Sequence, residues 1–578
     1  MASAKQQINS NETIMNEFNK SYLKDWPKKV DIARLNQRFG SPAWVVSENQ
    51  LISNVKVLEI FTDETSRIFY PVKTNPSLTV LQILAKLGVG ADCASQLEIN
   101  MALFAGIKIE NISYNSPAQD VNICKTLLES GAKVVMDDID TMLELQKTLK
   151  ETEFRGKLFL RVNLLEYAGY SQIKDNQELM AHGHKSSKFG IPVEDLENLL
   201  KQITIPISGL HVHVGTQMDN MHSFEYAIKE LNKLADRLST LGHNISDINI
   251  GGGLGIPFSS NDTFPSLEYW CSYMLQFKNN KYNYSAEPGH ALVGNAVSLL
   301  TKILSIKKSR GKKWAIVNVG TDQLAKVTLL RWTHRILDES GEELTQGTDA
   351  IAGPLCFAGD TLAENVSVSN LKKGSPLLIT EAGAYTYSLS NKFNGRLAPK
   401  WLLIKANGEQ IQTMANESLY DDLQHTKYEW NAIEHEHKPV ELDMSEISNL
   451  SSLYLKETSR EDSFEYKKVC KFSKNEFEFT VFTSSSVSFI SMPFAIRIIG
   501  DASIIAILHK DAHSQKDFPV WGQKLSIDCF GIVESNKPLE FTITLSESKI
   551  IDSKKYYVSR FKSSCGKLVG SLIVTYKN

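Results

Sequence analysis

The chain has 578 residues, of which 42% are hydrophobic and 22% are charged, and its formal net charge is -3. It is too long for one ordinary domain, and at about 100 to 250 residues per unit the length suggests three units. The weak negative charge excludes a basic nucleic-acid surface, and neither a run of about 18 apolar residues nor a targeting segment is visible. We therefore expect a cytoplasmic protein that acts on a small molecule, with no nucleic acid and no membrane as partner.

Short β-branched strands alternate with amphipathic helices in the first half of the chain. The strand RIFYPV precedes the helix SLTVLQILAKLG, KVVMDD precedes IDTMLELQKTLK, and KLFLRVN and DINIGGG supply further strands. This alternation is typical of βα units with a parallel sheet, and the stretch is long enough for eight of them. We predict a (β/α)8 barrel over 45–290, preceded by an N-terminal extension over 1–29.

The pattern changes to strands and turns after residue 290. The segments KKWAIVNVG and KWLLIKANGE predict a β-rich domain over 291–415, which also takes residues 30–44. Residues 416–449 are polar without a sustained apolar period and read as a linker. Beyond it, the strand EFEFTVFTSS, the apolar helix PFAIRIIGDASIIAILHK and several alternating strands predict an α+β domain over 450–578. The fold class is α/β: a barrel, a β-rich domain and an additional α+β domain.

The first candidate for chemistry is Lys73, in the segment FYPVKTNP. It ends an apolar strand that Asn75 and Pro76 terminate. A lysine there lies at the carboxyl-terminal mouth of a barrel, where active sites lie and where partial burial lowers an amine pKa enough for imine formation. When the segment is read alone, a surface lysine at a strand end is the favoured interpretation.

Seven later motifs follow this lysine in a fixed order: GADCASQLEI, SKFG, HVHVGTQ, INIGGGLG, AEPGH, GPLCFAGD and EAGAYTYSLSNKFNG. Together they resemble the ornithine and diaminopimelate decarboxylase family over roughly residues 30–415. The resemblance implies a pyridoxal-phosphate enzyme, a homodimer with shared active sites, and Lys73 as the residue that carries the cofactor in an aldimine. We expect a decarboxylase of an amino acid or amino-acid conjugate in a specialised biosynthetic pathway.

The triple glycine of INIGGGLG has a physical interpretation beside the resemblance. Glycines after a strand let backbone amides approach an anion closely, although a tight barrel turn would also need them. In the family this loop holds the cofactor phosphate. The resemblance assigns cofactor-binding roles to Asp92, Thr216, Gly252, Gly253, Gly289, His290 and Tyr385. His290 replaces the arginine of the family motif EPGR, so we expect a weaker or more pH-dependent grip on the phosphate.

Glu287 and His213 indicate the type of reaction. A carboxylate that faces the pyridine nitrogen keeps it protonated and makes the ring a strong electron sink. The related alanine racemases use an arginine there, so Glu287 favours decarboxylation over racemisation. His213 matches the histidine that stacks on the ring, and His211 points to the same face of the strand. Two histidines on a strand are also a candidate metal site, but further ligands at metal spacing are missing, and we expect no metal.

The segment GPLCFAGD bears on protonation and on the substrate. Cys356 resembles the cysteine that a second subunit delivers to protonate the carbanion left after carbon dioxide departs. Family members that act on diamines or diaminopimelate carry an acid at the next position, whereas this chain has Phe357, and Asp360 remains a candidate polar contact. Lys326 lies where diaminopimelate decarboxylases place a substrate-binding arginine, and it keeps the charge without the bidentate fork.

Two other functions stay open. One is a different enzyme on the same scaffold, either a racemase or a decarboxylase of a carrier-tethered amino acid. The other is a non-catalytic protein that binds pyridoxal phosphate, in which the C-terminal domain acts; the presence of both Glu287 and Cys356 argues against it. The C-terminal order of strand, apolar helix and four strands is similar to the hot-dog fold of thioesterases and acyl dehydratases. We expect it to bind an acyl or carrier-protein thioester, or else only to enlarge the dimer interface.

Overall fold

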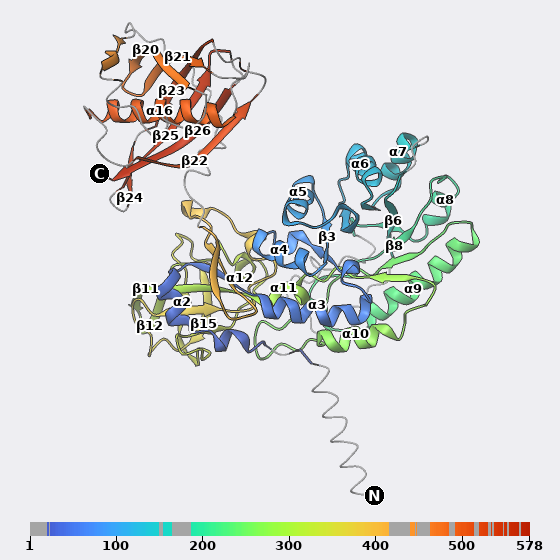
Figure 1. Cartoon of the computed structure of the whole chain (residues 1–578). Coiled ribbons are helices and arrows are strands. Elements are labelled where there is room, and N and C mark those ends of the chain that lie inside the picture. The colour runs from blue at the N-terminus through green and yellow to red at the C-terminus, as the bar shows by residue number, and fades with distance from the viewer. Residues whose placement is uncertain are drawn as a thin grey trace, which may run out of the picture. The chain divides into compact units, whose positions relative to one another are not determined.

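The chain forms two compact units, residues 1–417 and 418–578, each described by itself (Figure 1). The structure, a computed structural model, describes residues 20–21, 23–149, 154–164, 187–415, 440–445, 447, 463–484, 492–513, 520–529, 533, 537–546, 548–551, 554–565 and 568–577. Among these residues no helix is both long enough and apolar enough to cross a membrane.

A parallel barrel forms the first part of unit 1. In the described chain its eight strands are β2 (Phe69–Pro71), β3 (Gly90–Cys93), β4 (Ile112–Asn115), β5 (Lys133–Met136), β6 (Lys157–Asn163), β8 (Gly209–His211), β9 (Asp247–Asn249) and β10 (Asn283–Ser285). They pair in this order, all parallel, with the short β7 (Ile191–Pro192) beside β6. A bridge between Ile68 and Ala286 closes the ring. The predicted barrel is confirmed.

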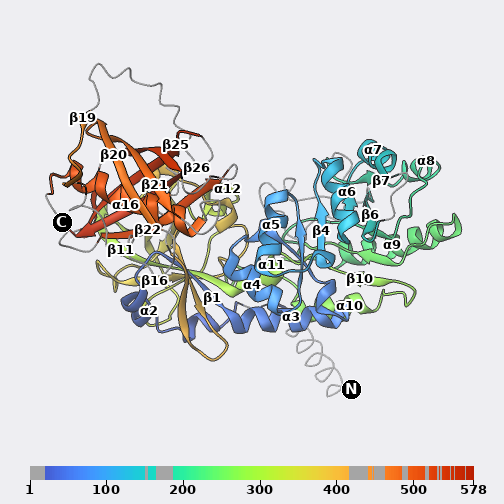
Figure 2. The same cartoon turned by 45° about the horizontal axis from the view of Figure 1, so that its top comes forward.

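Helices surround these strands. They are α3 (Glu48–Thr62), α4 (Leu78–Lys86), α5 (Gln96–Ala105), α6 (Val121–Ser130), α7 (Ile139–Leu149), α8 (Leu196–Leu200), α9 (His222–Thr240) and α10 (Leu267–Leu275). Both views agree that α5, α6 and α7 lie on one side of the barrel and α3 and α10 on the opposite side (Figure 1, Figure 2). Because helices cover the strands from outside and side chains fill the ring inside, barrel strands such as KLFLRVN are almost continuously buried.

The second part of unit 1 is a β-rich domain. Its strands are β1 (Ala43–Ser47), β11 (Val297–Ser309), β12 (Lys312–Val317), β13 (Ile336–Leu337), β14 (Gln346–Ala352), β15 (Thr361–Val366), β16 (Pro376–Ile379), β17 (Lys400–Ile404) and β18 (Gln410–Met414). Strand β1 lies between β11 and β17, so the N-terminal contribution to this sheet extends to Ser47. The short helices α2 (Ile32–Phe39), α11 (His290–Val293) and α12 (Ala325–Leu329) complete the domain.

Unit 2 contains one long helix packed on an antiparallel sheet. The sheet consists of β19 (Val440–Glu441), β20 (Ser463–Ser473), β21 (Glu476–Ser484), β22 (Val520–Cys529), β23 (Pro538–Leu545), β24 (Lys549–Ile551), β25 (Lys554–Ser563) and β26 (Leu568–Lys577), and the helix is α16 (Met492–Lys510). Helix α16 carries ten of the buried apolar side chains of this core on several of its faces, as its sequence predicts. The α+β class is therefore confirmed, while the hot-dog assignment stays a prediction. The predicted linker, 416–449, lies mostly outside the described residues.

Candidate active site

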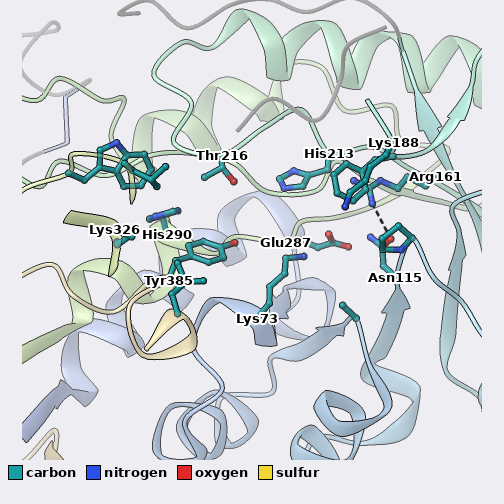
Figure 3. Close-up of a pocket in the computed structure, with 16 residues that line it drawn as sticks. Lys73, Asn115, Arg161, Lys188, His213, Thr216, Glu287, His290, Lys326 and Tyr385 are labelled. Carbon is teal, nitrogen blue, oxygen red and sulfur yellow. Dashed lines mark hydrogen bonds between the residues drawn. The ribbon is translucent and has the colours of Figure 1, made fainter. Parts of the chain in front are cut away.

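Polar side chains from seven barrel strands lie at one mouth of the barrel, and Figure 3 labels four of them, Lys73, Asn115, Arg161 and Glu287. They lie within or just after the carboxyl ends of β2, β3, β4, β6, β8, β9 and β10: Lys73, Asp92, Asn115, Arg161, His211, Asn249 and Glu287. Parallel strands bring their carboxyl ends together, which is why residues 73 and 287 become neighbours. The mouth holds a cavity of about 420 Å³. Its lining comprises Lys73, Ala94, Asn115, Pro117, Arg161, Lys188, Phe189, His213, Thr216, Glu287, His290, Lys326, Leu330, Trp332, Tyr385 and Leu389.

Lys73 points into this cavity from the turn after β2. Its Nζ lies 3.4 Å from Oδ2 of the buried Asp92. Burial alone lowers the pKa of Lys73, but the charges of Asp92, Tyr385 and Glu287 outweigh it and raise the pKa above its ordinary value. The expectation of a lowered pKa is therefore wrong, because the sequence did not reveal how many acidic groups surround the amine. Burial, with the charge of Glu287, raises the pKa of Asp92 to about 8.

Glu287 is buried below the cavity with both carboxylate oxygens engaged. Asn249 Nδ2 donates to Oε1 at 2.7 Å, and His211 Nε2 lies 3.1 Å from Oε2. Burial raises the pKa of Glu287, but the contact with His211 is the main effect that lowers it again, and the net pKa lies below its usual value. The carboxylate is thus held in its charged form.

The glycine run after β9 packs against neighbouring strand ends. A Cβ on Gly252 would lie 1.9 Å from the Glu287 carbonyl oxygen, and Gly251 and Gly253 have φ of 66° and 120°. A Cβ on Gly289 would lie 2.8 Å from Thr74 Oγ1 and 3.3 Å from the Tyr385 hydroxyl. Glycine is therefore required at these positions by space and backbone conformation.

Figure 3 shows how the labelled side chains divide the pocket. Lys326, His290 and Tyr385 lie at one end, Arg161 and Asn115 at the other, and His213 and Thr216 across from Lys73. His213, Thr216, Glu287, His290, Lys326 and Tyr385, to which the resemblance assigns binding roles, all line the cavity, and the roles stay predictions.

Three residues of the segment GPLCFAGD do not line the cavity of the chain that carries them: Cys356, Phe357 and Asp360. Cys356 is exposed, and its backbone N–H donates to Asn394 Oδ1 at 2.8 Å. Phe357 is 47% exposed. Asp360 is buried and accepts hydrogen bonds from the backbone amides of Thr321 at 2.7 Å and Leu355 at 2.8 Å. Asp360 therefore shapes the loop that presents Cys356, and it is not a lining residue of this chain's cavity.

Arg161, Asn115 and Asn249 were missed by the sequence reasoning. Arg161 Nη1 donates to Asp137 Oδ1 at 3.0 Å, and its guanidinium lies 4.5 Å from the centre of the Phe189 ring. All three belong to the last residues of barrel strands in ISYN, KLFLRVN and DIN. A polar residue among the last three of an apolar strand was the signal that could have found them.

Residues 50–294 match the model of the family described as pyridoxal-dependent decarboxylase, pyridoxal binding domain. The chain is 28% identical over 416 residues to a diaminopimelate decarboxylase of Zymomonas mobilis, covering 69% of this chain and 96% of the relative. With a diaminopimelate decarboxylase of Archaeoglobus fulgidus the identity is 26% over 410 residues, covering 68% and 94%. The crystal structure of diaminopimelate decarboxylase from M. jannaschii in complex with L-lysine superposes with a TM-score of 0.59 at 25% identity, covering 68% of this chain and 94% of that one.

Proposed function

This chain belongs to the pyridoxal-phosphate-dependent decarboxylase family, and we propose that it removes the α-carboxylate of an amino acid or amino-acid conjugate as carbon dioxide. The observation that carries the proposal is the buried, charged Glu287 beneath the cavity that Lys73 enters. When bound, pyridoxal phosphate supplies a sink for the electron pair left at the α-carbon. Lys73 would hold the cofactor covalently, and Glu287 would keep the pyridine nitrogen protonated.

The polar groups of the cavity fit this cofactor. Lys73 would hold the cofactor through its Nζ, and Asp92, whose Oδ2 lies 3.4 Å from that atom, would position the amine. The glycines at 252, 253 and 289, with Thr216, Tyr385 and His290, would surround the phosphate. His213 would stack on the ring from the side opposite Lys73.

Charge in the cavity supports an acidic substrate. Among the lining residues that the structure describes, Glu287 is the single carboxylate, against four lysine or arginine side chains. A distal ammonium group would find no free carboxylate there, and Phe357 offers none. Burying an unpaired ammonium costs several kcal/mol. We therefore propose that lysine, ornithine and meso-diaminopimelate are poor substrates, and that the preferred one carries further acidic or neutral groups, either free or tethered.

The exposed Cys356 supports a shared active site. We assign it to the cavity of a second copy of this chain, where it would protonate the α-carbon. Mixing inactive Lys73→Ala chains with inactive Cys356→Ala chains should then restore activity, because a hybrid dimer contains one intact site. Absence of recovery after verified subunit exchange would contradict the assignment.

The direct test of the proposed function is carbon dioxide release. Purified full-length protein is incubated with a panel of amino acids and carboxylate-rich amino-acid conjugates, with Lys73→Ala as the matched blank. We expect release from at least one acidic substrate, and chiral analysis distinguishes it from racemisation. Turnover of meso-diaminopimelate equal to that of the best substrate would overturn the substrate assignment, and Phe357→Glu should increase it if the assignment is right.

For unit 2 we retain the proposal of a thioester site. The buried helix α16 against an antiparallel sheet supports a domain of the hot-dog type, and an acyl or carrier-protein thioester is the ligand that we assign to it. We also propose a cytoplasmic location for the whole protein.

A further inference from the structure

One end of the cavity contains a lysine in aromatic surroundings. Lys326, on α12, has no exposed surface, and its Nζ lies 4.5 Å from the ring centre of Phe258 and 5.7 Å from that of Trp332. Among the residues that the structure describes, this Nζ has no hydrogen-bond partner. Buried ammonium groups are normally paired, because ring faces replace only part of the lost hydration. The lysine therefore requires either a lost proton or a partner beyond the residues that the structure describes.

Two histidines beside Lys326 also have unused ring nitrogens. In the described part of the chain, Nε2 of His290 and Nε2 of His334 are buried without a hydrogen-bond partner. The His290 ring centre lies 4.9 Å from that of Tyr385, and His334 Nδ1 lies 2.9 Å from the carbonyl oxygen of Thr380. We call Lys326, His290 and His334 together the basic chamber. Lys326 and His290 line the cavity, so a ligand in the cavity reaches this chamber.

The carboxylates around the chamber are engaged elsewhere. Asp322, four residues before Lys326, accepts from the Gly320 amide at 2.9 Å and pairs with Arg396 at 3.4 Å. Glu381 pairs with Arg335 at 3.1 Å. Tyr385 is a further titratable group next to His290. The chamber is thus rich in nitrogen donors and holds no counter-charge of its own among the described residues.

Burial sets the protonation of these groups. It lowers the pKa of Lys326 to about 7. Burial and the neighbouring Lys326 lower the pKa of His334 to about 3 and that of His290 well below its usual value. Above pH 7 the empty chamber is therefore mostly uncharged, and an arriving anion restores a partner for the ammonium form of Lys326.

We propose that the basic chamber binds an oxyanion, a phosphate or a carboxylate, and that each anion enters together with a proton taken up by Lys326. Two anions could occupy the chamber: the phosphate of the cofactor or an acidic group of the substrate. Only this choice between the two rests on the proposed function. An arginine at this position would be charged at every working pH. A lysine in this chamber instead makes anion binding depend on pH.

Isothermal calorimetry tests the proposal at pH 8, in two buffers of different ionisation enthalpy, which gives the number of protons taken up. In one arm, pyridoxal phosphate, pyridoxal and inorganic phosphate are titrated into the cofactor-free full-length chain; in the other, glutarate is titrated into the cofactor-loaded protein. Pyridoxal forms the same link to Lys73 without a phosphate, so its proton count is subtracted. Phosphate monoesters are already dianions at pH 8, since their second pKa is about 6.

We expect an uptake of about 0.9 protons per anion at pH 8, since a group with a pKa of about 7 is then about nine-tenths deprotonated. Affinity should fall about tenfold per pH unit above pH 8. Lys326→Arg should still bind the anion but without proton uptake, and Lys326→Met should weaken binding at least about tenfold. A merely structural lysine would leave the proton count unchanged in Lys326→Arg.

Uptake with either phosphate probe identifies the cofactor phosphate as the anion, and uptake with glutarate identifies a substrate acid. The proposal is overturned if no arm shows uptake, or if Lys326→Arg takes up as many protons as the unaltered chain. Should either variant unfold at the assay temperature, the other still decides through its own affinity and proton count. Failure of the proposed function is distinguishable: pyridoxal phosphate would then show no Lys73-dependent change in its absorbance, while inorganic phosphate still tests the chamber.

Discussion

A fully buried ionisable side chain lies on a helix in each unit, and the two have different surroundings. Lys326 on α12 lines the cavity and has no hydrogen-bond partner among the described residues. Asp501 on α16 is equally inaccessible, but it accepts a hydrogen bond from the Tyr466 hydroxyl at 3.0 Å. An unpaired buried charge costs several kcal/mol. Asp501 therefore meets its partner within unit 2, whereas Lys326 has none among the described residues and can meet one in a ligand.

The end of α16 repeats this arrangement. Asp511 accepts hydrogen bonds from the hydroxyls of Tyr557, at 2.5 Å, and Tyr576, and it pairs with Lys555 at 2.9 Å. These contacts connect the helix terminus to β25 and β26. We therefore expect Glu287→Gln in the barrel cavity to change function with little effect on stability, and substitutions of the paired groups in unit 2 to do the reverse.

The largest effect is expected from Glu287→Gln. The variant keeps the shape of the side chain but removes the charge that would face the pyridine nitrogen, so turnover should fall about 10²- to 10³-fold. The midpoint of thermal unfolding should stay close to that of the unaltered protein. Glu364→Gln, which removes a carboxylate that is paired with Lys312 outside the cavity, is the control. Turnover within a few-fold of normal in Glu287→Gln would contradict the role of this residue.

Tyr466→Phe should lower the stability of unit 2 without lowering turnover, which is the reverse of Glu287→Gln. Loss of the hydroxyl removes a partner from the buried Asp501, and the free energy of unfolding of unit 2 should fall by about 1–3 kcal/mol. Denaturant unfolding measures the loss, and a double-mutant cycle with Asp501→Asn isolates the pair. Carbon dioxide release should be unchanged. If release fell in parallel with stability, the division between the two units would fail.

Lys326→Met should stabilise the cofactor-free protein. Below pH 7 the lysine is protonated in both the folded and the unfolded chain, and the full penalty of burying the ammonium applies. Between the folded pKa of about 7 and the unfolded value of 10.5, the unfolded chain binds more protons, so the unaltered protein gains stability as pH rises. The stabilisation by methionine should therefore be largest at pH 6 and shrink toward pH 10. Thermal unfolding at both pH values checks this, and an equal difference at both would refute it.

The smallest effect on the barrel is expected from truncation after residue 415. The visible absorbance of bound cofactor and the unfolding midpoint of unit 1 should be retained, because the two units form separate cores. Binding of an acyl thioester, measured by calorimetry with acyl-coenzyme A and the full chain, should disappear on truncation. Equal thioester binding by both proteins, or none by the full chain, would refute the proposed role of unit 2.

Local sequence pattern predicts much of this fold. KLFLRVN coincides with β6, and PFAIRIIGDASIIAILHK with all but the first residue of α16, because hydrophobic period and length depend on neighbouring residues alone. Strand β20 was missed, since SFEYKKVCKFS alternates charged and apolar residues too irregularly for that signal. The lining positions of Lys73 and Glu287 followed from ordered motifs.

Properties that depend on distant segments were not accessible in this way. The raised pKa of Lys73 arises from Asp92, Tyr385 and Glu287, which three separate parts of the chain supply. The burial of Lys326 requires Phe258 and Trp332 from two different loops. Such groups act through space, and a linear sequence does not state their distances.

Strand β1 has a consequence for the synthesis of this protein. Residues 43–47 leave the ribosome early, yet their parallel partner β17 is residues 400–404. At about 5–20 residues per second, roughly 350 further residues take about 20–70 s to be made. During that interval the barrel sequence, which lies between the two strands, is already available to fold. The antiparallel partner β11 is made earlier, so until β17 is complete the nascent chain carries β1 with one edge unpaired, and a chaperone that shields this edge should raise the yield of active protein.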